Sequence, residues 1–196
     1  RDASVFDKPL DKWGPDVSNV TTMESMFEDA SIFNQDISNW NTSLVTKTNF
    51  MFKNAIKFDQ SLNDWSVNNV TTMEGMFQDA SAFNQPLYNW ASDVSNVTTM
   101  ESMFNGASIF NQDISNWNTQ EVTTMKNMFR GASNFDQSLN DWSVNSVTTM
   151  EGMFQDASAF NQPLYKWDVS TVLEDASGMF SGASSFNQDI SGWFPR

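Results

Sequence analysis

The amino-acid sequence repeats itself about every 26 residues along its whole length. One short unit cannot bury its own apolar side chains, so a repeat of this length indicates units that stack and share one continuous core. We expect a single repeat array, with a half unit at 1–13 and units at about 14–40, 41–65, 66–90, 91–117, 118–142, 143–167 and 168–193. The tryptophans mark the register at Trp13, Trp40, Trp65, Trp90, Trp117, Trp142, Trp167 and Trp193.

The first half of each unit has the apolar spacing of a helix. In residues 18–31, the positions of Val20, Met23, Met26 and Phe27 lie within an arc of roughly 120° if each residue turns by about 100°. A strand would place polar and apolar residues on the same face. The pattern therefore predicts an amphipathic helix of about three turns that needs neighbouring units for stability.

The second half of each unit is too short and too rich in Asn and Asp for another helix, as in residues 33–40. We interpret it as a turn and a short strand centred near Ile37. Parallel strands stack more closely than helices do, which would curve the array with its helices on the convex side. The predicted fold class is α/β, a leucine-rich-repeat-like solenoid. Its predicted core includes Trp40, Trp65, Trp90, Trp117, Trp142, Trp167, Phe27, Phe52, Phe77, Phe104, Phe129 and Phe154.

One unit departs from the common length in its predicted helix. The segment from Val172 to Met179 is one residue longer than its equivalents and places Ala176 where most other units have a methionine and one has Thr48. We expect a looser helix in this unit.

The unit resembles the 26-residue repeat of bacterial surface proteins. The residues that carry the resemblance are those of V-T-T-M-x-x-M-F-x-x-A-x-x-F-N-Q-x-I-x-x-W, from Val20 to Trp40. This repeat occurs in mycoplasma lipoproteins and is related to the BspA-like leucine-rich repeats. The resemblance covers nearly the whole chain and implies a repeat module at a cell surface or outside the cell, often associated with adhesion. It implies no catalytic residues.

Composition excludes several classes of function. The chain has neither Cys nor His, so thiolate catalysis, disulfides and the commonest general base and metal ligand are absent. A net charge of −14 opposes nucleic acid as a partner. No segment approaches the roughly 20 apolar residues of a membrane-spanning helix. We therefore expect no enzyme, no cofactor, no nucleic-acid partner and no direct membrane insertion of this segment.

The candidate binding residues flank the aliphatic position of the predicted strand. Tyr88 and Tyr165 are the only tyrosines and occupy equivalent positions, 77 residues apart. An exposed aromatic ring with a polar tip suits a protein or glycan ligand, although duplication alone would also explain the pair. Two residues before this position, other units carry Asp36, Asp113 and Asp189, which we also assign to the predicted concave face.

Two polar columns have competing interpretations. Asp or Asn recurs directly after the second phenylalanine of each unit, which favours a ladder that satisfies backbone donors over calcium ligands. Paired threonines, such as Thr21-Thr22, could order water on a flat surface, but the predicted helix would scatter them from one plane. The expected function is a non-catalytic module for adhesion or protein–protein interaction. The alternative is a structural building block in which copies stack end to end into a filament or sheath.

Overall fold

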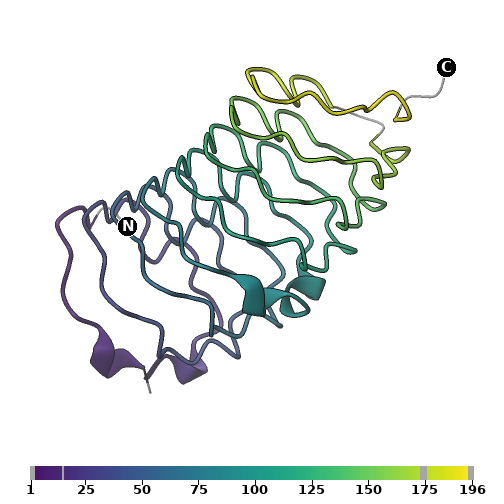
Figure 1. Cartoon of the computed structure of the whole chain (residues 1–196). Coiled ribbons are helices and arrows are strands. Elements are labelled where there is room, and N and C mark those ends of the chain that lie inside the picture. The colour runs from purple at the N-terminus through teal and green to yellow at the C-terminus, as the bar shows by residue number, and fades with distance from the viewer. Residues whose placement is uncertain (1–2, 15, 173–175, 194–196) are drawn as a thin grey trace.

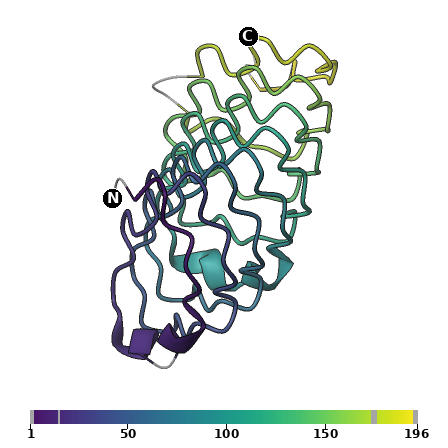
Figure 2. The same cartoon turned by 90° about the vertical axis from the view of Figure 1, so that its left-hand side faces the viewer.

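The chain winds through successive coils that stack along one axis. The computed structural model describes residues 3–14, 16–172 and 176–193. Each coil contains one sequence unit, and the coils follow one another from the N-terminal to the C-terminal end (Figures 1 and 2). We call this arrangement the coil stack. In the described residues, regular helix is limited to four short 3-10 helices: η1 (Asp11–Trp13), η2 (Asp16–Asn19), η3 (Tyr88–Trp90) and η4 (Asp93–Asn96).

The predicted α/β solenoid of helices and strands is wrong. Over the described residues, no α-helix forms in the first half of any unit and no strand forms in the second half. The β-structure consists of isolated parallel bridges in the half of the unit that was predicted to be helical. These bridges join equivalent residues of successive coils, in the order Thr22, Lys47, Thr72, Thr99, Thr124 and Thr149.

Residues in the left-handed conformation prevent the predicted helix. Ser25 and Asp29 have φ of 54° and 63°, and a right-handed helix cannot continue through such residues. Most of the equivalent positions carry Gly, Asn, Asp or Ser, and Gly, Asn and Asp are the residues that adopt this conformation at least cost. The first column is Ser25, Phe50, Gly75, Ser102, Asn127, Gly152 and Gly178, and the second is Asp29, Asn54, Asp79, Gly106, Gly131, Asp156 and Gly182.

Backbone N–H groups in the first half of each unit donate alternately to the next coil and to their own coil. The N–H groups of Met23 and Phe27 donate to carbonyls of the next coil, those of Lys47 and Met51, at 2.9 and 2.8 Å. The N–H of Met26, between them, donates to the carbonyl of Met23 in its own coil at 3.2 Å. One set of bonds closes the turns and the other joins the coils, so the conformation of each coil depends on its neighbour.

Side chains join the coils in the second half of the unit, where a strand was predicted. The Asn111 Oδ1 atom accepts the backbone N–H of Asp136 at 2.9 Å and the Nε2 of Gln137 at 3.0 Å. The backbone bond recurs along the Asp/Asn column, and the glutamine bond accompanies it at every described step except Asp59. The column therefore satisfies backbone donors, and these donors belong to the next coil.

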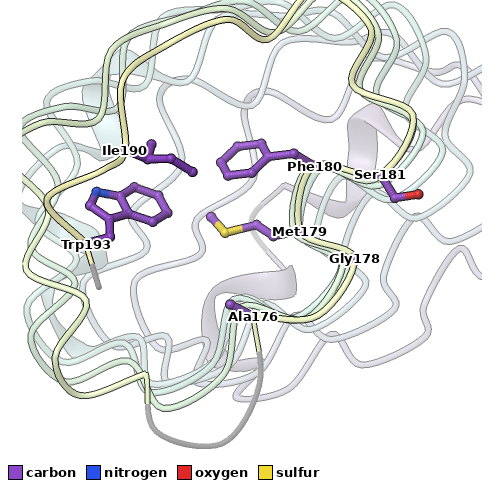
Figure 3. A pocket seen from close by; sticks show the side chains of 7 residues that line it. All are labelled: Ala176, Gly178, Met179, Phe180, Ser181, Ile190 and Trp193. Atoms are coloured by element: carbon purple, nitrogen blue, oxygen red, sulfur yellow. The ribbon is translucent and has the colours of Figure 1, made fainter. Parts of the chain in front are cut away.

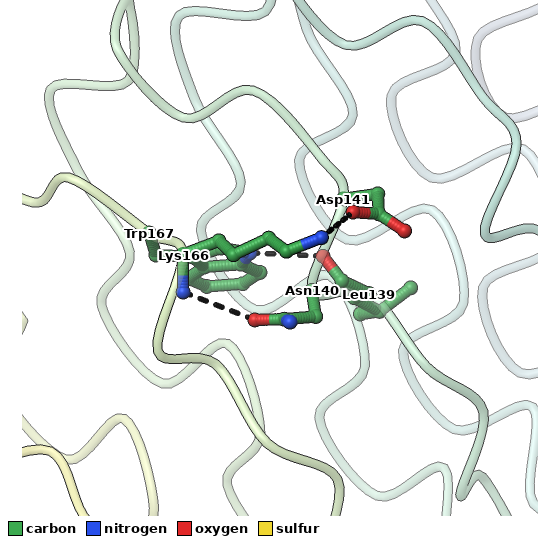
Figure 4. A network of polar contacts seen from close by, with 5 residues as sticks. All are labelled: Leu139, Asn140, Asp141, Lys166 and Trp167. Atoms are coloured by element: carbon green, nitrogen blue, oxygen red, sulfur yellow. Dashed lines mark hydrogen bonds and ion pairs between the residues drawn. The ribbon is translucent and has the colours of Figure 1, made fainter.

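Indole groups add a second set of contacts between coils. The Nε1 of Trp167 donates to the carbonyl of Leu139 at 2.9 Å (Figure 4). Equivalent bonds at 2.9–3.5 Å start from Trp40, Trp65, Trp90, Trp117, Trp142 and Trp167. These bonds tie each of these six buried rings to the preceding coil, whereas the buried Nε1 of Trp193 has no partner in the described structure.

Stacked aromatic rings form the centre of the core. The Phe104 ring lies 4.0 Å from the Phe110 ring of its own coil and 5.5 and 5.7 Å from the Phe77 and Phe129 rings of the neighbouring coils, measured between centroids. Each inner coil repeats this arrangement. The twelve residues assigned to the core from the sequence are all buried, with exposed fractions of 4% or less.

Differences in unit length are accommodated at one corner. The two 27-residue units have two extra residues between a tryptophan and the buried valine that follows it, Val17 in one unit and Val94 in the other. The 3-10 helices η2 and η4 form there. The extra residue of the seventh unit falls in a segment that includes 173–175, outside the described residues. The looser helix expected in this unit falls partly outside the described residues, and residues 177–180, in the described part, form turns and not a helix.

Replacing Asn111 by alanine tests the side-chain ladder. Two donors of the next coil would lose their acceptor, so we expect the free energy of unfolding to fall by about 2 kcal/mol. Urea unfolding followed by tryptophan fluorescence measures the change. Asn111→Asp is the matched control, because the Oδ1 of Asp136 accepts the equivalent backbone bond one coil later and an aspartate can therefore replace Asn111 as the acceptor. Equal losses in both variants would contradict this assignment.

Candidate functional site

The structure places both candidate tyrosines at the surface. The exposed fractions are 54% for Tyr88 and 71% for Tyr165. Tyr88 begins η3, and Tyr165 occupies the equivalent position in a coil without that helix. Because no strand forms here in the described chain, the predicted concave strand surface does not exist. The tyrosines lie instead beside the tryptophan column, Tyr88 in η3 and Tyr165 in a turn.

The three candidate aspartates also lie at the surface and close turns there. The Oδ1 atoms of Asp36, Asp113 and Asp189 each accept the backbone N–H of the residue two positions later, at 2.9 Å in all three cases. The hydroxyl and N–H of Ser38 lower the pKa of Asp36 below its ordinary value, and Ser115 does the same for Asp113. The N–H and hydroxyl of Ser191 lower the pKa of Asp189. All three are therefore carboxylates at neutral pH, and each leaves its second oxygen outside this bond.

A hollow of about 320 Å³ brings two of the five candidates together. Tyr165 and Asp189 line it, from adjacent coils. Its other lining residues are Trp167, Ile190, Ser191, Gly192 and Trp193. Asp36 does not line this hollow, and Tyr88 and Asp113 lie in other coils of the stack. An exposed ring, a carboxylate and a concave surface form a chemically mixed site suited to a polar or charged ligand.

Reasoning from the sequence missed Gly192. The residue before the tryptophan is Asn39, Asp64, Asn89, Asn116, Asp141 or Lys166 in the other complete units. Only the last unit has glycine there, and comparing the units at this one position could have found the exception. With no side chain at this position, the surface beside Tyr165 stays open.

The two other candidate surfaces are used in coil contacts. The oxygens of the Asp/Asn column accept bonds from the next coil, as described above, and no group of three or more acidic residues in the described chain could hold a metal ion. The exposed threonines do form a regular column, contrary to the scattering expected from a helix. Their hydroxyls donate to the preceding coil: the Oγ1 of Thr46, for example, lies 2.9 Å from the carbonyl oxygen of Thr21.

The surface carboxylates link folding stability to pH. The pKa values of Asp36 and Asp113 are lower in the folded protein than the ordinary 3.8, so the unfolded chain binds more protons in acid. Their stabilising contribution is present above about pH 3.8 and is lost as the pH falls through the lower folded values. Burial and nearby carboxylates raise the pKa of Glu74, which acts in the opposite direction.

We therefore expect a lower urea midpoint at pH 3 than at pH 6. Asp113→Asn keeps an oxygen that can accept the Ser115 N–H but cannot titrate, so this variant should show a smaller fall between the two pH values. A fall as large as that of the parent would contradict a contribution from Asp113.

Comparison with known proteins identifies the repeat. A model of the family described as "Mycoplasma protein of unknown function, DUF285" matches residues 1–94 and again 90–193. No match to a curated protein was found. No helix of the described residues is long and apolar enough to cross a membrane. The two matches span almost the entire sequence, so the chain belongs to this DUF285 family of mycoplasma repeat proteins.

Proposed function

We propose that the coil stack is a non-catalytic binding module that mediates adhesion or protein–protein interaction. The observation that carries this proposal is the hollow beside Tyr165, where a strongly exposed ring and a carboxylate meet on adjacent coils. Large amphipathic rings supply much of the energy at protein interfaces at a small cost in entropy. The coils behind the hollow are held by backbone and side-chain bonds, which gives the site a rigid support.

A location outside the cell or at its surface is part of the same proposal. It is supported by the resemblance of the unit to the 26-residue repeat of bacterial surface proteins. The partner is a protein or glycan, because a net charge of −14 opposes binding to nucleic acid. The dispersed carboxylates and the lack of histidine support a role without catalysis.

Surface plasmon resonance with the immobilised chain tests this proposal against a panel of purified extracellular proteins and oligosaccharides. We expect at least one ligand whose affinity falls about tenfold or more in Tyr165→Ala, since central aromatic residues dominate binding energy. Tyr88→Ala is the matched control, because it removes the equivalent ring without touching the hollow. Ligands that bind both variants and the parent equally, or a panel without any ligand, would overturn the proposal.

The alternative function is a structural building block, with further copies of the chain as partners. Apolar hollows of about 210 and 270 Å³ at the two ends of the described coil stack support it. Figure 3 shows the second of these, where Phe180, Met179 and Trp193 surround open space. Another copy, or further units of the same repeat, would cover such ends. Unbranched fibres in electron micrographs would support end-to-end stacking, and a monomer at all accessible concentrations would exclude it for this segment.

A further inference from the structure

We propose that the hollow beside Tyr165 binds an arginine side chain of a basic partner protein. The inference rests on the proposed function and specifies the chemistry of the same site. It follows from four features of the hollow: an exposed ring, a carboxylate, a backbone acceptor without a donor, and a missing side chain.

The charges around the hollow favour a cation. Asp189 contributes a carboxylate to its wall. Among the described residues, Lys166 adjoins Tyr165 in sequence but extends toward the preceding coil, where its Nζ lies 2.5 Å from Asp141 Oδ1 (Figure 4). The lysine charge is thus balanced locally, while the whole chain carries a charge of −14. Such a field speeds the approach of basic partners and disfavours acidic ones.

The Tyr165 carbonyl group supplies a hydrogen-bond acceptor. In the described structure, no donor reaches this oxygen from the backbone or from a side chain. The equivalent oxygen of Tyr88 has two donors, the N–H of Ala91 at 3.4 Å and the Nδ2 of Asn116 at 3.1 Å. The Asn116 amide therefore shows that a carbonyl at this position can accept a planar nitrogen donor from the next coil.

Gly192 has no side chain that could donate to the Tyr165 carbonyl in this way. It occupies the position of Asn116, one residue before the tryptophan of the following coil. A Cβ atom added to Gly192 would meet no atom within 4 Å, and its φ is not in the left-handed region. The glycine is therefore not needed for the conformation of the coil. Because it has no side chain, Gly192 puts no group beside Tyr165 where Asn116 puts its amide beside Tyr88.

Arginine matches all of these features together. Its guanidinium group is planar, stacks on aromatic faces, stays charged, and carries five N–H donors that can reach a carboxylate and a carbonyl at once. A lysine ammonium supplies the charge but neither the plane nor the fork of donors. A neutral sugar could stack on the ring and donate a hydroxyl hydrogen bond to Asp189, but it carries no positive charge to balance the carboxylate.

Titration of the ¹⁵N-labelled chain with a short arginine-containing peptide, followed by NMR, tests the proposal. Matched peptides carry citrulline, the neutral isostere, or lysine in place of arginine. We expect amide shifts at Ser191 and Gly192 that saturate with a dissociation constant on the order of 1 mM, as suits one side chain at an open site. The citrulline peptide should bind about fivefold or more weakly, and the lysine peptide should lie between the two.

Two variants of the chain complete the test. Gly192→Asn should abolish the shifts by supplying the internal amide, and Asn116→Gly should create a second responsive site beside Tyr88. The spectra of both variants away from these coils report that the fold is intact. Equal binding of the arginine and citrulline peptides, or unchanged binding by Gly192→Asn, would overturn the proposal. A partner protein that depends on Tyr165 but not on charge would leave the binding function standing while excluding arginine.

Discussion

Replacing Phe104 by alanine is expected to lower the free energy of unfolding by about 4 kcal/mol, the typical cost of deleting a buried phenylalanine ring. This ring has no exposed surface and stacks on rings of its own coil and of both neighbours. Removing it leaves a cavity that the surrounding coils cannot collapse into, because their backbones are joined by hydrogen bonds. Chemical unfolding followed by circular dichroism measures the loss.

A second substitution separates the effect of neighbours from that of the ring itself. Phe180 is the equivalent residue of the last described coil, where its ring is partly exposed and stacks on Phe154 of one neighbouring coil. Phe180→Ala should cost less than half as much as Phe104→Ala. Equal costs would contradict the view that stability accumulates through contacts between adjacent coils.

Gly75→Ala is expected to destabilise the chain by about 3 kcal/mol. Gly75 has φ of +56°, where a Cβ costs about 1 kcal/mol or more. The added methyl group would also lie 2.5 Å from the Phe50 ring, which must then move at a cost of about 1–3 kcal/mol. Thermal unfolding by calorimetry measures the combined effect.

Phe50 provides the matched test of that clash. It is itself in the left-handed conformation, at φ of 57°, where Ser25 and Ser102 stand in other coils. Phe50→Ser should therefore be well tolerated, and Gly75→Ala should cost only about 1 kcal/mol in that background. Gly192→Ala, with open space around the added atom, should be close to neutral. Additive effects of Phe50→Ser and Gly75→Ala would show that the ring is not the obstacle.

The repeat register could be predicted from the sequence because it depends on large side chains. Phe104 and Trp117 recur at constant spacing, and a stack of units can bury them only in columns. Spacing alone says which residues face inward. It does not say how the backbone runs between them, because a series of tight turns can bring the same side chains to one side as a helix does.

The secondary structure was mispredicted because the informative residues are polar and small. Asp29, Asn54 and Gly106 share one position of the unit, and what they have in common is tolerance of positive φ. Apolar periodicity carries no information about that property. The strand prediction failed for a related reason: side chains such as Asn111 supply the contacts between coils that a strand would make with its backbone.

The candidate site was only partly predictable. Tyr165 stood out by residue type, and Asp189 by its place in the unit. Their position around one hollow depends on the stacking of adjacent coils and on the absence of a side chain at Gly192. Asp113 lies in the coil after Tyr88, as Asp189 lies in the coil after Tyr165, but Asn116 stands there in the position of Gly192. The unit before Asp36 has no tyrosine.

The corner occupied by η2 and η4 shows where the array tolerates change. Two coils carry extra residues there, while the hydrogen-bonded ladders and ring columns pass through those coils in register. Natural variation has thus already tested this corner as an insertion point. A loop, an epitope or a label could be inserted between Ala91 and Asp93 without changing the hydrogen-bonded ladders or the ring columns. Recombination between units of unequal length would likewise give chains that can fold, because this corner accommodates the difference in length.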